Sequence, residues 1–444
     1  MSLMRNMGAM WQGGPAWSMP CSGLLWRGSS GGGSADAFDL FRTPAAVIAP
    51  ARTPPHLGTM ILLVAMVVLT LNMFLPALPH MAEDFGVSEA TMGLAVSAYM
   101  VAAGVLQLIL GPISDLLGRR RVILVAVAVY ALASLGAAVA TDFSVFLACR
   151  LVQALVLAGS VVGLAALRDM YTTREAAGKM GTIAAAMAIA PMIGPTFGGV
   201  LDTLIGWRAI FALYAGLGAA CLVLCWFDWG ETRVQVRRSP QEQMAAYRAL
   251  LGSGLFWAYA MCTGVSVGTF YIFLTGAPFV AQASFGLSTT WIGVGLGSIT
   301  GGYMIGSTVT ARLAPRLGVS VLILTGRSFA LAGLCVGAGL FLIGVSHPMV
   351  LFGATICVGL GNGLTISNTN AGLISVRPDL AGSAAGLSGA LQLFGGAVLT
   401  GLTLPWMAAG ATPLRLLALM IVASVVALGL AVLAARGAAR QPQE

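Results

Sequence analysis

Long apolar runs, separated by short polar turns, fill most of the chain after residue 56. A run of about 20 apolar residues is long enough to cross a bilayer as a helix. The apolar positions do not alternate with the period of two that marks a membrane β-barrel strand. We therefore predict an all-α integral membrane protein with twelve transmembrane helices. The predicted spans lie at 57–79, 90–112, 121–141, 143–167, 178–203, 206–228, 254–283, 289–311, 319–344, 348–374, 380–408 and 411–435.

A polar segment at 229–253 separates the first six predicted spans from the last six. This spacing predicts an N-terminal six-helix half at 57–228, a cytoplasmic linker and a C-terminal six-helix half at 254–436. Residues 437–444 are expected to form a short cytoplasmic tail. Residues 1–56 are rich in Gly, Ser and Pro and lack the sustained apolar core of a signal peptide, so we expect a disordered cytoplasmic tail there.

Charge is scarce and unevenly placed. Charged residues make up 9% of the 444 residues, against about 25% in soluble domains. The Lys and Arg residues concentrate in the even-numbered loops, the linker and the tails, which predicts a multi-pass inner-membrane protein with both termini cytoplasmic. The net charge of +8 is then a topology signal and does not indicate nucleic acid. The basic residues assigned to the cytoplasmic side include Arg168, Arg312, Arg316 and Arg327.

The stretch between the second and third spans combines an acid, two glycines and arginines. We interpret it as a cytoplasmic turn in which glycine permits close backbone approach. Its acid lies near a helix end, where it can meet a helix N-terminus or an arginine across the two halves. We interpret the stretch as a latch at the cytoplasmic gate; the alternative is a simple positive-inside turn. The residues of this latch are Gly111, Asp115, Gly118, Arg119 and Arg120.

Four motifs resemble those of a known family. The G-x-x-x-D-x-x-G-R-R pattern after the second span resembles the signature of the major facilitator superfamily. The run from Asn72 to Pro79 is similar to the D-M-Y-L-P-A-L-P of its bicyclomycin/chloramphenicol-type drug-efflux family. Arg150 to Ala154 resembles that family's R-x-x-Q-G/A, and Ala190 to Gly199 resembles the G-P-x-x-G-G antiporter motif. The resemblance covers about 57–436 and implies a transporter fold of two six-helix halves.

Arg150 is predicted to lie at membrane depth, inside the fourth span. A charge at that depth normally faces a cavity or a partner, and Gln153 shares its helical face. We interpret the pair as a polar centre that couples substrate or protons to the conformational change; the alternative is an arginine that snorkels to the outer interface. Asn72 stands where the related family has an aspartate, and asparagine cannot titrate. Proton coupling would then use another route, or Arg150 would attract an anionic or strongly polar substrate.

The fifth span carries a group of prolines and glycines. Proline removes a backbone donor and is expected to kink the helix, while glycine permits close packing against a neighbouring helix. The alternative is the general frequency of Gly and Pro in membrane helices. The residues of this predicted antiporter-motif kink are Pro191, Gly194, Pro195, Gly198 and Gly199.

Four residues of the C-terminal half are candidate cavity-lining groups: Phe270 and Tyr271 in span seven, Asn362 in span ten and Gln392 in span eleven. Aromatic rings would offer an apolar surface, and amides would offer hydrogen bonds to a substrate. Such amides also join helices to one another, which is the alternative interpretation.

These features favour a secondary active transporter that exports small amphipathic drug-like molecules by alternating access, with substrate bound near mid-membrane between the halves. Proton antiport is the expected coupling. The alternative is a facilitator or importer of an organic anion without proton coupling through position 72. No phosphate-binding loop that would indicate ATP drive occurs, no catalytic constellation indicates an enzyme, and no metal or cofactor is expected. The expected partners are a small-molecule substrate, protons and the lipid bilayer, with the chain acting as a monomer; a membrane sensor is a further alternative.

Overall fold

The computed structural model describes residues 55–232, 240–408 and 410–439. These residues form twelve long helical segments and one additional helix, which confirms the predicted all-α membrane fold. The predicted tail at 1–56 lies outside the described residues except for its last two positions, and so do Arg233, Arg237 and Arg238 of the linker. The helices are α1 (Leu57–Asn72), α2 (Leu78–Phe85), α3 (Glu89–Leu117), α4 (Arg119–Val139), α5 (Phe143–Gln153), α6 (Ala158–Met170), α7 (Thr173–Leu204), α8 (Arg208–Asp228), α9 (Pro240–Leu251), α10 (Gly254–Phe285), α11 (Thr289–Leu317), α12 (Val319–Leu342), α13 (Pro348–Ser375), α14 (Ala381–Ala408) and α15 (Pro413–Ala439).

Two predicted spans are interrupted helices. The first consists of α1, a short 3-10 turn at Leu75–Ala77 and α2, because the prolines in this segment cannot donate helical hydrogen bonds. The fourth consists of α5, a 3-10 turn at Ala154–Leu157 and α6. Both segments run further than the sequence predicts, to Phe85 and to Met170.

Ten of the described segments are long and apolar enough by composition to cross a membrane, and α7 and α11 are not among them. Helix α7 carries Arg174, Glu175 and Lys179 in its first turns, and α11 is rich in Gly and Thr. Both helices nevertheless exceed 18 residues, since α7 has 32 and α11 has 29. Their lower hydropathy follows from these charged, small and hydroxyl-bearing residues.

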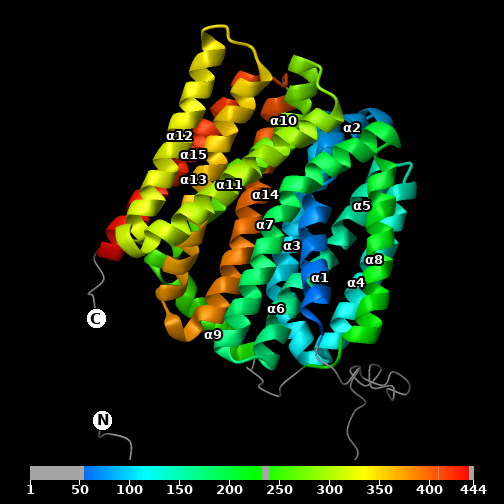
Figure 1. Ribbon diagram of the computed structural model, residues 1–444, viewed down its shortest axis with the longest axis vertical. Helices are drawn as coiled ribbons and strands as arrows, with labels where there is room; N and C mark the ends of the chain where they lie inside the picture. Colours follow the sequence, from blue (N-terminus) through cyan, green and yellow to red (C-terminus); the bar gives the residue numbers. More distant parts are fainter. Residues whose placement is uncertain (1–54, 233–239, 409, 440–444) are drawn as a thin grey trace, which may run out of the picture. The chain divides into compact units, whose positions relative to one another are not determined.

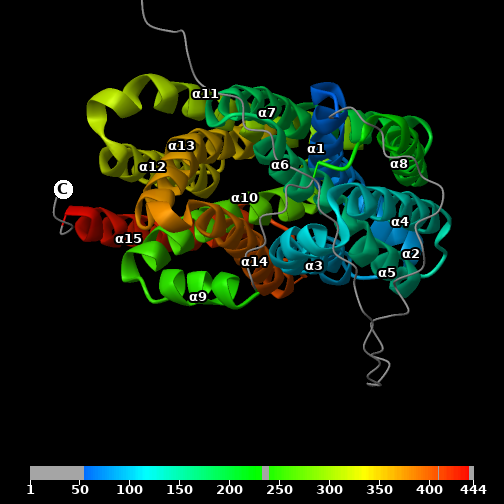
Figure 2. The same cartoon turned by 90° about the horizontal axis from the view of Figure 1, so that it is seen from below.

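The helices form two groups that meet along two pairs of helices. We call α1 to α8 the first group and α10 to α15 the second group. Helix α3 lies beside α14, and α7 lies beside α11 (Figure 1 and Figure 2). We call the end of the helices that bears Gly118 and α9 the linker end, which is at the bottom of Figure 1, and the other the far end.

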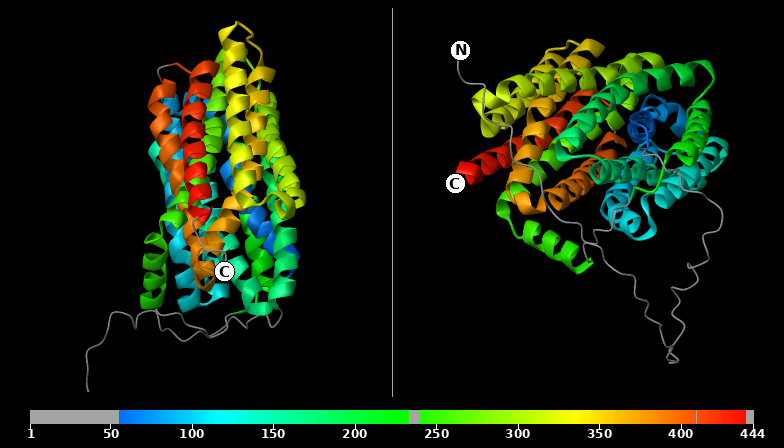
Figure 3. Two further views of the ribbon diagram at one scale, coloured as in Figure 1. Left: turned by 90° about the vertical axis from the view of Figure 1, so that its left-hand side faces the viewer. Right: turned by 60° about the horizontal axis from the view of Figure 1, so that its bottom comes forward.

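Helix α9 was not predicted, since the sequence indicated only a polar linker at 229–253. It contacts α14 and α10 of the second group at the linker end (Figure 3). Its burial explains why it folds: Leu250 and Ala246 are buried, while Gln241 and Glu242 are exposed. A short amphipathic helix of this kind is stabilised by packing more than by propensity.

The turn predicted between the spans at 90–112 and 121–141 is wrong in its extent, because the structure has a much shorter one. Helix α3 continues to Leu117 and α4 begins at Arg119, so Gly118 alone separates them. Gly118 has φ +95°, a backbone conformation that favours glycine. A Cβ there would also collide with the carboxylate of Glu231. The tight reversal therefore depends on this one glycine.

The two groups are in closest contact at the far end, where glycines of α7 meet α11. A Cβ on Gly199 would overlap the backbone of Thr289, and a Cβ on Gly293 would overlap the carbonyl of Pro195. Thr203 Oγ1 and Thr289 Oγ1 are hydrogen-bonded at 2.8 Å. At the linker end of α7, by contrast, Gly181 has open space around it. Helices α7 and α11 are therefore tightly packed against each other at the far end.

Helix α7 runs unbroken through Pro191 and Pro195, so the expected kink stays a prediction. The expected close packing is present: a Cβ on Gly198 would overlap the carbonyl of Met73, and one on Gly194 would lie 3.1 Å from the side chain of Leu69. These contacts join α7 to the last turn of α1 and to Met73, the residue that follows it.

We expect Gly198→Ala to destabilise the protein because the obstructing atom is a main-chain oxygen that cannot rotate away. Overpacking of this kind costs about 1–3 kcal/mol. The measurement is the unfolding temperature of detergent-solubilised protein, with transport followed in parallel. Gly181→Ala, in the same helix with no atom within 4 Å, is the matched control. Equal unfolding temperatures for the two variants would contradict the packing argument.

Candidate functional site

A cavity of about 360 Å³ lies between the two helix groups. It is lined from the first group by α1 and α7 and from the second by α10, α11, α13 and α14. Six of the residues singled out from the sequence line it together: Asn72, Pro191, Phe270, Tyr271, Asn362 and Gln392. The remaining lining residues are Val67, Val68, Leu71, Met187, Val267, Thr300, Tyr303, Ile366, Gly389 and Leu393. We call this space the central cavity.

The central cavity is apolar with a few polar groups, which is the usual composition of a small-molecule site. Asn72 donates from Nδ2 to the carbonyl of Val68 at 2.8 Å, and its buried Oδ1 has no hydrogen-bond partner. Gln392 donates to Ser388 at 3.1 Å and to Asn370 at 3.3 Å. None of the described lining residues is Asp or Glu.

Arg150 does not line the central cavity but is buried behind its first-group wall. Its exposed fraction is 0%, so the side chain does not snorkel to the interface. Nη1 donates to Gln153 Oε1 at 2.7 Å, as the shared helical face predicted, and to the carbonyl of Thr70 at 3.3 Å. Gln153 in turn donates to Ser134 Oγ at 2.7 Å. The network reaches α1 two residues before Asn72.

Aromatic rings surround the Arg150 guanidinium. Its Cζ lies 4.3 Å from the centroid of Phe74 and 4.5 Å from that of Tyr99, within the range of a cation–π contact. Nε and Nη2 have no hydrogen-bond partner. Among the described residues no carboxylate lies within ion-pair distance of Arg150. The sequence did not indicate Thr70, Tyr99 or Ser134, because hydroxyl-bearing residues recur throughout the apolar runs and nothing in the sequence distinguishes these three.

Arg327 was assigned from the sequence to the cytoplasmic loops, and the structure corrects this. It lies in α12 with an exposed fraction of 0%. Its guanidinium donates to Asn362 Oδ1, a group that lines the central cavity. The signal was present, since residue 327 falls well inside a span predicted to begin at 319. The depth argument applied to Arg150 would have found Arg327 as well.

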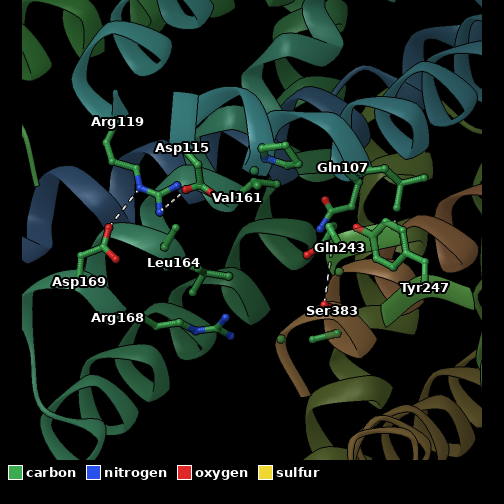
Figure 4. Close-up of a pocket in the computed structure, with 17 residues that line it drawn as sticks. Gln107, Asp115, Arg119, Val161, Leu164, Arg168, Asp169, Gln243, Tyr247 and Ser383 are labelled. Carbon is green, nitrogen blue, oxygen red and sulfur yellow. Dashed lines mark hydrogen bonds and ion pairs between the residues drawn. The ribbon is translucent and has the colours of Figure 1, made fainter. Parts of the chain in front are cut away.

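A second cavity, of about 370 Å³, lies at the linker end between α3, α4 and α6 of the first group, α14 of the second group and the linker helix α9. Its polar lining is shown in Figure 4. Arg119 binds Asp115 at 2.7 Å and Asp169 at 3.1 Å on one side. On the other side Gln243 of α9 donates to Ser383 of α14 at 3.4 Å. We call this space the linker-end cavity.

The expected arginine contact of Asp115 across the two halves is wrong for this structure. Asp115 pairs with Arg119, four residues on, and Arg119 reaches Asp169 of α6, so these ion pairs stay within the first group. The pairing follows from helix geometry, because α3 extends to Leu117 and brings the acid next to the start of α4. Asp115 and Arg119 still face the second group across the linker-end cavity.

Two further members of the predicted latch have different surroundings. Arg120 donates to the carbonyls of Trp226, at 2.7 Å, and Trp229, and so satisfies the C-terminal end of α8. Gly111 was expected to allow close approach, but nothing lies within 4 Å of where its Cβ would be. The close approach occurs at Gly118 instead.

Two six-helix groups with a closed contact at one end, a cavity between them and membrane-buried arginines define a membrane transporter, not an enzyme. Residues 60–400 match the family model described as Major Facilitator Superfamily, and the chain belongs to this superfamily.

Several curated proteins are similar in sequence. The chloramphenicol resistance protein of Pseudomonas aeruginosa is 32% identical over 268 residues, 60% of this chain and 63% of that protein. The uncharacterized MFS-type transporter YdgK of Bacillus subtilis (strain 168) is 30% identical over 249 residues, 54% of this chain and 62% of that protein. The chain thus aligns with less than two thirds of the length of these two relatives. Multidrug resistance protein D of Escherichia coli (strain K12) is 27% identical over 357 residues, 78% of this chain and 87% of that protein.

Solved structures share the fold at low sequence identity. A bacterial homolog of the human lysosomal transporter Spinster, in an inward-facing and occupied conformation, has a TM-score of 0.70 at 14% identity, covering 86% of this chain and 96% of that chain. The D-xylose-proton symporter has a TM-score of 0.65 at 13% identity, covering 84% and 96%. These likenesses concern the fold alone.

Proposed function

We propose that the protein exports small amphipathic drug-like molecules by alternating access, with the substrate bound in the central cavity and protons as the antiported ion. The central cavity carries this proposal, because it is mostly apolar, has a few amides and hydroxyls, and is walled by both helix groups. A ligand held there contacts both groups, so their relative motion changes its access. The names of the chloramphenicol and multidrug resistance relatives support a drug-like substrate.

We further propose that the linker end is cytoplasmic and that the helix groups at 57–228 and 254–436 act as the two moving halves. The distribution of basic residues supports this orientation. The linker end carries Arg119, Arg120, Arg121, Arg168, Arg312 and Arg316, and the far end carries Glu83, Asp84 and Asp142. With α7 and α11 tightly packed at the far end, the structure then corresponds to a state closed to the outside.

In this scheme the Asp115–Arg119–Asp169 cluster belongs to the cytoplasmic gate. The cluster holds the α3–α4 reversal rigid, and Gly118 lets Glu231 accept a hydrogen bond from the amide of Arg119 at 3.0 Å. The acid and the arginine line a cavity that must narrow when the halves close at this end. Contact with α14 would form on closure.

A second function is favoured by one observation. No described residue that lines the central cavity is an acid, and Asn72 offers an unpartnered amide oxygen in place of a carboxylate. A facilitator or importer of an organic anion would need no titratable group at position 72. The positive charges of the buried Arg150 and Arg327 are compatible with an anionic substrate.

Transport in proteoliposomes tests both functions. We expect purified protein to move chloramphenicol faster when a pH gradient is imposed, because an antiporter draws its driving force from that gradient. Protein-free liposomes are the control. Flux that ignores the gradient would favour the facilitator, and the absence of flux for chloramphenicol and for organic anions would overturn both functions.

A further inference from the structure

Arg327 forms a buried hydrogen-bond network within the second helix group. Nε donates to Thr365 Oγ1 at 2.8 Å, and Nη1 donates to Ser266 Oγ at 2.8 Å. Nη2 donates to Asn362 Oδ1 at 2.5 Å. The three nitrogens thus join α12 to α10 and α13. All three acceptors are neutral oxygens.

The charge of Arg327 has no counter-ion. Among the described residues no carboxylate lies within 4 Å of its guanidinium. Arginine keeps its proton in proteins, so a full positive charge is buried at membrane depth. Such a charge is expensive and usually functional. The hydrogen bonds that join α12 to α10 and α13 do not by themselves explain an arginine at this position, because a neutral amide could donate hydrogen bonds there without burying a charge.

Arg327 is connected to the central cavity through one side chain. Asn362 lines the cavity and accepts from Arg327 through Oδ1. Its Nδ2 donates to the carbonyl of Ser266 at 3.3 Å, which uses one of its two N–H groups. The arginine therefore fixes the orientation of the amide, and the N–H that remains is a donor. A donor backed by a positive charge favours acceptor groups on a ligand.

The first helix group has a related but indirect arrangement. Asn72 lines the opposite wall, and Arg150 donates to the carbonyl of Thr70, two residues earlier, and not to Asn72 itself. The ionisable groups that influence Arg150 are Tyr99, Tyr130 and Tyr214, and none is an acid. Within the described part of the chain, an apolar cavity without Asp or Glu in its lining thus lies between two guanidiniums that no carboxylate neutralises. A low-dielectric cleft with charges of one sign focuses their field.

We propose that Arg327, together with Arg150, makes the central cavity electropositive, so that its substrates are neutral or anionic amphipathic molecules and cations are excluded. The inference rests on the proposed transport function and narrows its substrate class. It applies to either direction of transport, because the field acts on any ligand in the cavity. Arg327 is the specificity-determining residue of the second group, acting through Asn362.

The test compares three probes that share a ring system and differ in charge: naphthalene carboxylate, naphthalene carboxamide and naphthylmethylammonium. Binding to the full-length purified protein is measured by calorimetry, and flux is measured in proteoliposomes. We expect the carboxylate and the carboxamide to bind at least about tenfold more tightly than the ammonium probe, as one unit charge in a partly buried site allows. If the unmodified protein binds the three probes with equal affinity, that result alone overturns the inference, and no variant needs to be measured.

Variants then assign the effect to Arg327. We expect Arg327→Gln to reduce the discrimination against the ammonium probe about tenfold, measured as the ratio of the ammonium and carboxamide affinities within the variant. Arg327→Lys keeps the charge and should keep the discrimination. Arg312→Gln removes the same charge at an exposed position of α11 and is the matched control. Discrimination in Arg327→Gln equal to that of the unmodified protein would overturn the role of Arg327.

The outcomes separate this inference from the function on which it rests. Binding and flux of all three probes, without preference for charge, would overturn the substrate class and leave the transporter function intact. Absence of binding and flux for every probe, and for chloramphenicol, would overturn the proposed function and this inference with it. A purely structural Arg327 would alter the unfolding temperature and leave the ratio of probe affinities unchanged.

Discussion

Arg150→Met is expected to reduce transport about 100-fold, which corresponds to the loss of roughly 2–3 kcal/mol of charge-assisted hydrogen bonding. The guanidinium is held between Phe74 and Tyr99 and bonded to Gln153 and to the carbonyl of Thr70, so no water can replace it. Its Nε and Nη2 are unpartnered, which leaves donors that a moving helix or a ligand can engage. The measurement is initial flux in proteoliposomes at matched protein density.

The same variant is expected to unfold at an equal or higher temperature. Replacing a buried ion pair by apolar residues of similar volume is often neutral or stabilising by about 1–4 kcal/mol, whereas removing one partner destabilises by leaving the other charge unpaired. No described carboxylate pairs with Arg150, so its substitution leaves no such charge behind. Methionine is flexible enough to fill the space between the rings. A loss of transport with retained stability would identify Arg150 as a functional charge. Arg121→Met, at an exposed position of α4, is the control. Normal transport by Arg150→Met would contradict this account, and so would a large fall in the unfolding temperature of that variant.

Asn72→Asp is expected to make transport strongly dependent on pH and to reverse the charge preference of the central cavity. The new carboxylate would stand where the amide oxygen is buried and unpartnered. A unit charge at roughly 8 Å in an effective dielectric of 20 is worth about 2 kcal/mol, or about 30-fold in affinity for a cation. The measurements are flux across a range of pH values and the affinities of charged probes.

The direction in which pH changes the binding of cationic probes follows from the protonation state of the introduced aspartate, which is charged only when deprotonated. At high pH the aspartate is ionised and partly neutralises the buried arginines, so cationic probes bind. At low pH it is protonated and the cavity returns to the electropositive state of the unmodified protein. Gln392→Glu places an acid on the opposite wall and tests whether position 72 is special. An unchanged pH profile in Asn72→Asp would show that this position does not control coupling.

Much of the central cavity could be predicted one residue at a time. Asn72, Phe270, Tyr271, Asn362 and Gln392 were each recognisable as polar or aromatic groups within apolar runs. That they line one space depends on the rotation of four helices, α1, α10, α13 and α14. Lipid and protein interior are equally apolar, so a membrane helix carries little sequence information about which face is buried. Arg327 was missed for a related reason. The basic residues were assigned to the loops on one side of the membrane, and the position of each one within its predicted span was not considered.

The sequence by itself determined the number and order of the long helices, the glycine packing of α7 and the membrane depth of Arg150, because hydropathy and residue size act locally along the chain. Only the tertiary structure decided which groups meet. It placed Arg327 behind Asn362, paired Arg119 with both Asp115 and Asp169, and formed α9 against α14. Each of these contacts depends on the rotation of a helix about its axis or on the number of residues in a turn. A shift of one residue in either moves a side chain to a different neighbour.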